Sequence, residues 1–255
     1  MDELNAKIEL LSRWIGECPE HGLVFLGGAG VSTESGIPDF RSPTGLYGKP
    51  YEYDYPPETM ISRSFFDARP QDFFDFYVSR MLFLEAAPND AHRALAKLEQ
   101  MGKLSAVITQ NIDGLHQAAG SLNVLELHGS VWRNYCMGCG KSYTVEELKE
   151  AAELSKDGVP RCKECDGIIK PDVVLYEESL DGNVLRKAVD AIRSATMMIV
   201  AGTSLAVYPA AGLLDYFNGD HLVIINKAPT SQDKKADLCI DAKVGEVLAE
   251  ATKDL

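Results

Sequence analysis

Two pairs of cysteines are the strongest chemical signal in this sequence. Cys136 and Cys139 form one C-x-x-C pair, and Cys162 and Cys165 form the other. Two such pairs present four thiolates that can bind Zn²⁺ tetrahedrally and close its coordination shell. Disulfide bonds are the alternative, but six cysteines in a chain of this length fit a reducing compartment better than a disulfide framework. The spacing therefore predicts one structural, non-catalytic Zn²⁺.

A glycine-rich segment is the second chemical signal. Residues 27–36 read Gly-Gly-Ala-Gly-Val-Ser-Thr-Glu-Ser-Gly and follow the apolar run Leu23–Leu26. Glycines after a strand let the backbone approach a pyrophosphate, and a following helix would add its positive end. A plain structural turn is the alternative, because the spacing departs from the usual dinucleotide fingerprint. The continuation Ile37-Pro-Asp-Phe-Arg41 places an acid, an aromatic ring and a cation where the far end of a dinucleotide would lie.

Polar side chains follow the other apolar runs directly. They are Thr109-Gln-Asn-Ile-Asp113, Gly202-Thr-Ser204 and Asn226. The carboxyl ends of parallel strands meet at one edge of a sheet, where ligands bind, so these segments predict a shared site. Capping of the next helix by Asn111 or Asp113 is the alternative for the first segment. Ordinary turns could explain the other two.

One histidine stands apart from the rest. His128 ends a short strand predicted to begin at Leu125, and it precedes the cysteine pairs. Neutral imidazole is the usual general base near pH 7, and a buried structural role is the alternative. The remaining histidines lie in helical or loop-edge contexts, and we assign structural roles to them: His21, His92, His116 and His221.

Four apolar runs bounded by turn residues must position these groups. Their apolar residues are continuous rather than alternating, which is typical of strands buried on both faces of a parallel sheet. Between them, apolar residues recur at helical spacing over residues 3–16, 89–100 and 184–192. This alternation predicts an α/β fold with a doubly wound, Rossmann-like parallel sheet. The runs are Leu23–Leu26, Ala106–Ile108, Met197–Ala201 and Leu222–Ile225.

Two stretches interrupt the alternation. Residues 42–88 are rich in proline and tyrosine and include a helix-like aromatic segment around Phe73. Residues 129–171 hold the cysteine pairs and Thr144-Val-Glu-Glu147, a capping box that predicts a helix over residues 146–154. We expect both stretches to form a smaller helical and zinc-ribbon domain. The Rossmann-like domain is then discontinuous and comprises residues 1–41, 89–128 and 172–255.

The charge of the chain disfavours some classes of partner. Its 255 residues include 38 acidic and 25 basic side chains, a formal net charge of −13 at pH 7. Generic binding to nucleic acid or to an anionic membrane is therefore not expected. The first residues lack the basic flank of a leader peptide, and no apolar stretch reaches the length of a membrane span. We expect a cytoplasmic monomer.

In this order, the motifs resemble those of the sirtuins, the silent-information-regulator family of NAD-dependent protein lysine deacylases, in their bacterial form. The resemblance runs from about residue 23 to residue 226. Any one motif could occur by chance, whereas the ordered set is highly specific. The matching stretches are residues 28–41, 109–116 and 127–129, the two cysteine pairs, and residues 170–174, 202–205, 208–211 and 224–226.

The resemblance implies a reaction that consumes NAD as a co-substrate. The acyl group of an acyl-lysine would pass to ADP-ribose in a cleft between the two domains, releasing nicotinamide, free lysine and O-acyl-ADP-ribose. His128 would be the general base, with Asn111 as a second catalytic residue, and residues 173–178 would pair by backbone with the extended acyl-lysine peptide. The residues implied to contact NAD are Ala29, Thr33, Phe40, Arg41, Gln110, Ile112, Asp113, Thr203, Ser204, Asn226 and Val244.

Two departures from the family pattern concern the substrate. The family often reads Phe-Gly-Glu where this chain has Tyr176-Glu177-Glu178, and Glu177 could add negative charge near the cleft and favour basic peptides. Family members that prefer succinyl-type groups carry a tyrosine and an arginine shortly after the Phe-Arg motif. Residues 46–53 offer tyrosines and no arginine. We therefore expect a neutral acyl group, most simply acetyl.

Three other activities stay open on the sequence alone. An oxidoreductase could use the same glycine-rich loop, but no acidic residue ends a second strand about twenty residues later, and its product would be NADH. A non-enzymatic reader would bind NAD or an acylated tail without turnover and would not need His128. A third possibility is the transfer of ADP-ribose to proteins.

Overall fold

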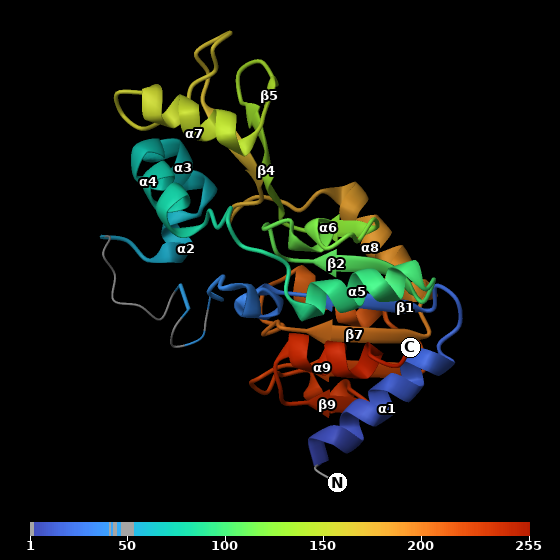
Figure 1. The fold of residues 1–255 in the computed structure, drawn as a ribbon. Helices are drawn as coiled ribbons and strands as arrows, with labels where there is room; N and C mark the ends of the chain where they lie inside the picture. The colour runs from blue at the N-terminus through green and yellow to red at the C-terminus, as the bar shows by residue number, and fades with distance from the viewer. Residues whose placement is uncertain (1–2, 41, 43–44, 47–53) are drawn as a thin grey trace.

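The strands of the structure form two sheets of unequal size. The computed structural model describes residues 3–40, 42, 45–46 and 54–255. Within these residues there is a six-stranded sheet and a three-stranded sheet. Figure 1 shows the larger sheet between layers of helices, with the smaller sheet and a group of helices projecting from one side.

The six-stranded sheet is parallel throughout. It contains all four of the predicted apolar runs, which confirms the prediction of a buried parallel sheet. In spatial order, its strands are β3 (Val124–Glu126), β2 (Leu104–Thr109), β1 (Leu23–Gly27), β7 (Met197–Ala201), β8 (His221–Ile225) and β9 (Leu238–Ile240).

Neighbouring residues of β1 point into two different cores. Phe25 packs into one core and Leu26 packs into the other, and both side chains are fully buried. This is why the run is continuously apolar, since both faces of the sheet are covered by helices. The sheet is therefore doubly wound, as predicted. On the Phe25 face lie α1 (Glu3–Glu17), α5 (Asp90–Gln100) and α9 (Val244–Thr252), and on the Leu26 face lie α8 (Gly182–Ser194) and the 3₁₀ helix η3 (Ala210–Tyr216).

The order of the strands reverses beside β1. The chain passes from β1 to β2 and β3 on one side and later returns to β7 on the other side. In doubly wound sheets, ligands bind at such a switch point, beyond the carboxyl ends of the strands. The glycine-rich loop follows β1 and Gly202 follows β7. Both segments therefore stand at the predicted ligand-binding edge.

The smaller sheet has a core that joins two distant stretches of sequence. Aromatic side chains from residues 60–77 pack there against apolar side chains from residues 131–175. This core therefore joins parts of the two stretches that interrupt the alternation, and its last strand runs past residue 171. The elements are α2 (Pro57–Met60), α3 (Arg63–Ala68), α4 (Pro70–Arg80), β4 (Gly129–Cys136), β5 (Ser142–Tyr143), α7 (Val145–Leu154) and β6 (Ile169–Val173).

Polar side chains cap the N-termini of two helices, α7 and α5. Thr144 caps α7, because its hydroxyl accepts the Glu147 amide at 3.2 Å and the Glu147 carboxylate accepts the Thr144 amide at 2.8 Å. The predicted capping box is thus confirmed. Asn89 caps α5 in a similar way and accepts the Ala91 amide at 2.9 Å. Within the described residues, no helix is both long enough and apolar enough to cross a membrane.

The prediction of a helix directly after the glycine-rich loop is wrong. Two short 3₁₀ helices stand there instead, η1 (Ala29–Val31) and η2 (Thr33–Ser35). Gly30 packs directly against Gly202, and Gly36 ends η2 with a φ of +84°. The loop therefore turns back over the sheet edge before an α-helix can form. The strand predicted to end at His128 stops two residues earlier, because β3 ends at Glu126.

Candidate active site and zinc centre

One cavity of about 750 Å³ gathers almost all of the predicted site residues. It lies beyond the carboxyl ends of β1, β2 and β7 and extends to residues 173–178, which follow the smaller sheet. Arg41, the remaining predicted NAD contact, lies outside the described residues. The predicted catalytic and NAD-binding residues that line the cavity are Ala29, Thr33, Phe40, Gln110, Asn111, Ile112, Asp113, His128, Thr203, Ser204, Asn226 and Val244.

Two glycines bring the loops after β1 and β7 into direct contact. The amide of Gly30 donates to the carbonyl of Gly202 at 2.8 Å. A Cβ added to Gly30 would lie 2.6 Å from the Cα of Gly202, and Gly202 itself has a φ of +60°. Only glycine fits this approach without displacing backbone. The bare backbone at the switch point suits a pyrophosphate, which agrees with the predicted role of the loop.

A buried hydrogen-bond chain links the loop after β1 to the segment after β2. The Asn111 side chain donates to the Ser32 hydroxyl at 3.0 Å, and Ser32 donates to the Asp113 carboxylate at 2.7 Å. Asp113 also accepts the Leu115 amide at 2.9 Å, so the helix-cap alternative holds for Asp113 but not for the Asn111 side chain. Burial raises the pKa of Asp113, and the hydrogen bonds from Leu115 and Ser32 oppose that shift.

The loop after β7 is tied to the same segment. Gln110 donates from its side-chain amide to the Thr203 hydroxyl at 3.1 Å, and Thr203 also accepts the Leu205 amide at 3.2 Å. These bonds fix the Thr203 side chain at the edge of the cavity. Amide and hydroxyl groups held in this way suit the hydroxyls and phosphates of a nucleotide.

Asn226 and Val244 lie toward the other end of the sheet edge. The Asn226 side chain donates to the Ala228 carbonyl at 2.8 Å and so stabilises its own turn. Val244 is 3% exposed at the start of α9, where the next amide, of Gly245, donates to the Glu34 carboxylate at 2.8 Å. Both residues line the cavity, which thus has a polar and an apolar side chain from this part of the sheet edge.

A backbone carbonyl fixes the tautomer of His128. Its Nδ1 lies 2.9 Å from the carbonyl of Gln110. A carbonyl only accepts, so Nδ1 carries the proton and Nε2 keeps a free lone pair. Burial lowers the pKa of His128, and the bond to Gln110 opposes part of that shift. The imidazole is therefore neutral at pH 7 and has the form that a general base needs.

Residues 173–178 line the cavity beside His128. The Val174 amide donates to the His128 carbonyl at 3.0 Å. Tyr176 pairs with residues on both sides of Ser62, since its amide donates to the Ile61 carbonyl and its carbonyl accepts the Arg63 amide, both at 3.0 Å. Val174 and Tyr176 therefore have strand-like backbone pairing, and the chain turns at Glu177 and Glu178.

The four paired cysteines form one cluster in the smaller domain. Their Sγ atoms all lie within 4.8 Å of one another. The Cys136–Cys165 and Cys139–Cys162 sulfur distances are 3.4 Å and 3.6 Å, far longer than the bond of about 2.05 Å in a disulfide. Zn–S bonds of about 2.3 Å would separate the sulfurs of a tetrahedral site by about 3.8 Å. The cluster therefore fits a four-thiolate zinc site.

Hydrogen bonds to the sulfurs support the same assignment. The amides of Gly138 and Glu164 donate to Cys136 and Cys162 at 3.3 Å and 3.4 Å, and the Tyr143 hydroxyl donates to Cys162 at 3.1 Å. Such bonds stabilise thiolates and orient metal ligands. Since four thiolates leave no open position, the site suits a structural ion and not a catalytic one.

Two residues of the site, Ser32 and Trp132, were not predicted from the sequence. Ser32 connects Asn111 to Asp113, although it lies inside a motif that was recognised for other residues. Trp132 lines the cavity and donates from Nε1 to the Asp113 carbonyl at 2.8 Å. A lone tryptophan in a strand carries no signal of its own. The position of Ser32, directly after the glycine-rich turn, is the one signal that could have singled it out.

Comparisons with known proteins agree with this geometry. A model of the Sir2 family matches residues 28–209. NAD-dependent protein deacetylases of Clostridium acetobutylicum and Clostridium perfringens are each 54% identical to this chain, over 95% and 98% of it and 96% and 98% of their own lengths.

Solved structures of Sir2 proteins share the fold. A Sir2 bound to an acetylated peptide is 39% identical with a TM-score of 0.86, and the match covers 97% of this chain and 98% of that one. A Sir2 with a deacetylated p53 peptide and 3'-O-acetyl ADP-ribose is 40% identical with a TM-score of 0.88, at the same coverage. With its doubly wound sheet, its glycine contact at the switch point and its cysteine cluster, this chain belongs to the Sir2 family, the sirtuins.

Proposed function

We propose that this protein is an NAD-dependent protein lysine deacetylase. The observation that carries the proposal is the single cavity that joins the switch-point glycines, His128 and residues 173–178. A dinucleotide site, a neutral base and a strand for a peptide thus share one space. The acetyl group of an acetyl-lysine passes to ADP-ribose, and nicotinamide, free lysine and O-acetyl-ADP-ribose are released. The 54% identity to bacterial NAD-dependent protein deacetylases supports this assignment.

NAD binds along the switch-point edge in this proposal. Gly30 and Gly202 leave room for the pyrophosphate, and Thr203, Ser204 and Asn226 hold the adenosine half beside Val244. The segment after β2 surrounds the nicotinamide end. The side chains assigned there are Phe40, Gln110, Asn111, Ile112 and Asp113, together with Arg41 from outside the described residues. Ala29 and Thr33 are assigned to the loop that binds the phosphates.

His128 accepts a proton from a hydroxyl of the nicotinamide ribose. Its Nε2 is the free acceptor, because Nδ1 is bound to the Gln110 carbonyl. That proton transfer follows attack by the acyl oxygen on the ribose carbon, whose bond to nicotinamide breaks. The deprotonated ribose oxygen then attacks the acyl carbon, and addition of one water lets the bond between the acyl carbon and the lysine nitrogen break. Asn111, oriented through Ser32, binds the ribose. Because these contacts orient the two side chains, less entropy is lost when the imidazole, the ribose hydroxyl and the acyl group come together.

The acyl-lysine peptide pairs with residues 173–178, and the cysteine cluster holds one structural Zn²⁺. We further propose that the protein acts as a monomer in the cytoplasm and binds neither nucleic acid nor membranes. The net charge of −13 supports this, because it disfavours binding to polyanions. The division into a Rossmann-like domain and a smaller zinc-ribbon domain is part of the same proposal.

The test follows an acetyl-lysine peptide with purified protein, with and without NAD, by peptide mass and nicotinamide release. We expect acetyl loss only with NAD, and His128→Ala should lower kcat by about 10²- to 10⁴-fold. His21→Ala, a histidine outside the cavity, is the matched control and should keep its activity. Production of NADH would favour an oxidoreductase, and NAD binding without turnover would favour a reader.

The acyl group is tested with a succinylated peptide of the same sequence. Residues 46–53 contain no arginine to pair with a succinyl carboxylate. We therefore expect a higher kcat/KM for the acetylated peptide. Faster processing of the succinylated peptide would overturn the preference for a neutral acyl group and leave the reaction class intact.

A further inference from the structure

Glu177 has a backbone conformation that ordinarily belongs to glycine. Its φ is +75°, in the left-handed region where a side chain is strained. Such strain is unfavourable and persists only where other contacts hold the residue in place. Glu177 lies within residues 174–178, which we call the peptide turn, and it lines the cavity.

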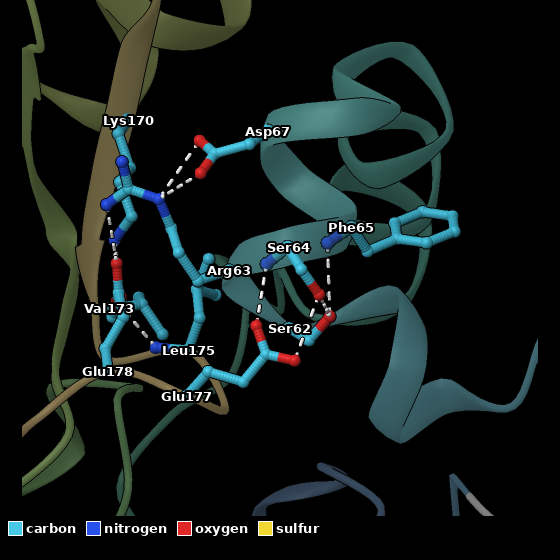
Figure 2. Close-up of polar contacts among 10 residues, drawn as sticks. All are labelled: Ser62, Arg63, Ser64, Phe65, Asp67, Lys170, Val173, Leu175, Glu177 and Glu178. Carbon is cyan, nitrogen blue, oxygen red and sulfur yellow. Dashed lines mark hydrogen bonds and ion pairs between the residues drawn. The ribbon is translucent and has the colours of Figure 1, made fainter.

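The contacts that hold Glu177 come from a helix more than a hundred residues away in sequence. Its two carboxylate oxygens accept the Ser64 amide at 2.9 Å and the Ser64 hydroxyl at 3.0 Å, as Figure 2 shows. Ser64 lies in the first turn of α3, where backbone amides have no partner within the helix. The next amide, of Phe65, is satisfied by the Ser62 hydroxyl at 3.2 Å. Glu177 thus completes the capping of α3.

The following residue, Glu178, points the other way and holds the opposite side of the peptide turn. Its carboxylate accepts the Leu175 amide at 2.9 Å, the buried Lys170 ammonium at 3.2 Å and Arg63 at 3.1 Å. Burial raises the pKa of Glu178, but the Leu175 amide and the Lys170 charge outweigh it and hold that pKa below its ordinary value. Two consecutive carboxylates therefore fasten the turn on both sides.

We propose that Glu177 is a positioning residue for the peptide substrate, which acts by fastening the peptide turn to Ser64 of α3. The proposal rests on the deacetylase function argued above. The hydrogen bonds to Ser64 hold the carboxylate against α3 but leave its negative charge in place, so the expectation that Glu177 favours basic peptides needs a separate test. The fastened turn presents its backbone in a fixed position, so less entropy is lost when the peptide pairs with it.

The experiment measures steady-state kinetics with neutral and basic acetyl-lysine peptides. Glu177→Ala should raise the peptide KM by about tenfold, the effect expected for loss of a charge-assisted hydrogen bond. The kcat and the KM for NAD should stay within about twofold, because uniform peptide binding is what is lost. Ser64→Ala should have a smaller effect in the same direction, and the double variant should equal Glu177→Ala because the two residues act as a unit.

Two further variants are controls. One separates the contact with Ser64 from the backbone strain at Glu177, and the other tests whether loss of any exposed glutamate changes the kinetics. Glu177→Gly relieves the backbone strain but also removes the contact with Ser64. It should therefore raise the peptide KM as Glu177→Ala does, but the Glu177→Gly protein should have a higher melting temperature than the Glu177→Ala protein. Glu153→Ala removes an exposed glutamate of α7 that does not line the cavity and should leave all constants unchanged.

The outcomes distinguish this proposal from the proposed function. Multiplicative effects of the two single variants, or an unchanged peptide KM in Glu177→Ala, would overturn it while leaving the deacetylase assignment in place. A change in the ratio of KM values for neutral and basic peptides would instead support a direct charge effect. If the unaltered protein shows no NAD-dependent turnover, the proposed function fails. Amide hydrogen exchange then tests, without turnover, whether Glu177 fastens the peptide turn. If it does, the amides of the turn must exchange faster in Glu177→Ala.

Discussion

The amide of Val174 donates to the backbone carbonyl of His128 at 3.0 Å, while Nδ1 of the same histidine lies 2.9 Å from the Gln110 carbonyl. His128 is therefore bonded on one side to the stretch proposed to pair with the peptide and on the other side to the segment proposed to surround nicotinamide. The first contact holds the backbone of His128, and the second orients its imidazole. This is the place at which a base shared by two substrates has to stand.

The pH dependence of turnover should report His128. Burial lowers its pKa, so the neutral base persists to lower pH than an ordinary histidine with a pKa of about 6.5. We expect kcat to rise with pH through a midpoint below about 6.5 and to be level at pH 7. Measured kcat values between about pH 5 and pH 8 check this. A midpoint well above the ordinary value would contradict the assignment of His128 as a buried neutral base.

Removal of the metal should unfold the smaller sheet. The purified protein should contain about one zinc ion per chain by elemental analysis, and Cys139→Ser or Cys165→Ser should lose it. Because zinc binding is coupled to folding, a strong chelator should abolish activity together with the circular dichroism signal of this domain. Cys239→Ser, outside the cluster, is the control and should retain zinc. Full activity in metal-free protein would rule out the structural role.

A buried pair of histidines should make the protein sensitive to acid. The rings of His92 and His116 are 4.7 Å apart, and burial lowers their pKa values to about 4 and about 3. The unfolded chain, with ordinary pKa values of about 6.5, binds more protons in this range. The free energy of unfolding should therefore fall as pH drops from about 6.5 toward 4, by up to about 1.4 kcal/mol per pH unit for each histidine.

Denaturant unfolding at a series of pH values measures that slope. His116→Phe keeps an aromatic ring in the same core and removes one titrating group, so its stability should depend less steeply on pH. At pH values above about 7, where both histidines are neutral, the pH dependence of the two proteins should coincide. The same slope in both proteins below about pH 6.5 would show that other groups cause the acid sensitivity.

The contact between Gly30 and Gly202 predicts a sharp difference between two glycine substitutions. In Gly202→Ala the new Cβ would lie 2.4 Å from the Val31 nitrogen at a φ of +60°. Overpacking and left-handed strain together should cost about 2 to 4 kcal/mol of stability and weaken NAD binding. In Gly182→Ala, at the start of α8, the added Cβ meets nothing within 4 Å, so stability should stay equal or rise slightly. Denaturant melts and NAD titration compare the two.

Long apolar runs and fixed motif spacing predicted most of the fold and the zinc cluster. β1 and β7 were readable because all of their residues are buried, whereas β9 has only three residues and carries too short a pattern. The cysteine spacing was sufficient because each pair lies in one local turn. The Rossmann-like sheet was therefore predictable from local sequence, apart from one short edge strand.

Contacts between distant residues account for what sequence could not give. The η1 and η2 turns depend on the approach of Gly30 to Gly202, which follows another strand of the sheet. The left-handed φ of Glu177 depends on Ser64, which no local pattern brings near it. The free nitrogen of His128 likewise depends on a carbonyl eighteen residues earlier. The sequence therefore indicates most of the residues that form the site, whereas contacts with distant residues determine their conformations.

The place of β1 at the middle of its sheet matters while the chain is being synthesised. β1 comes first in chain order among the strands of its sheet, yet its partners begin at Leu104 and at Met197. The five residues of β1, all buried in the finished protein, must therefore stay unpaired along one edge until most of the chain has left the ribosome. An apolar strand with an open edge can pair with other chains. A ribosome stalled before Met197 would leave this strand as the segment most in need of a chaperone.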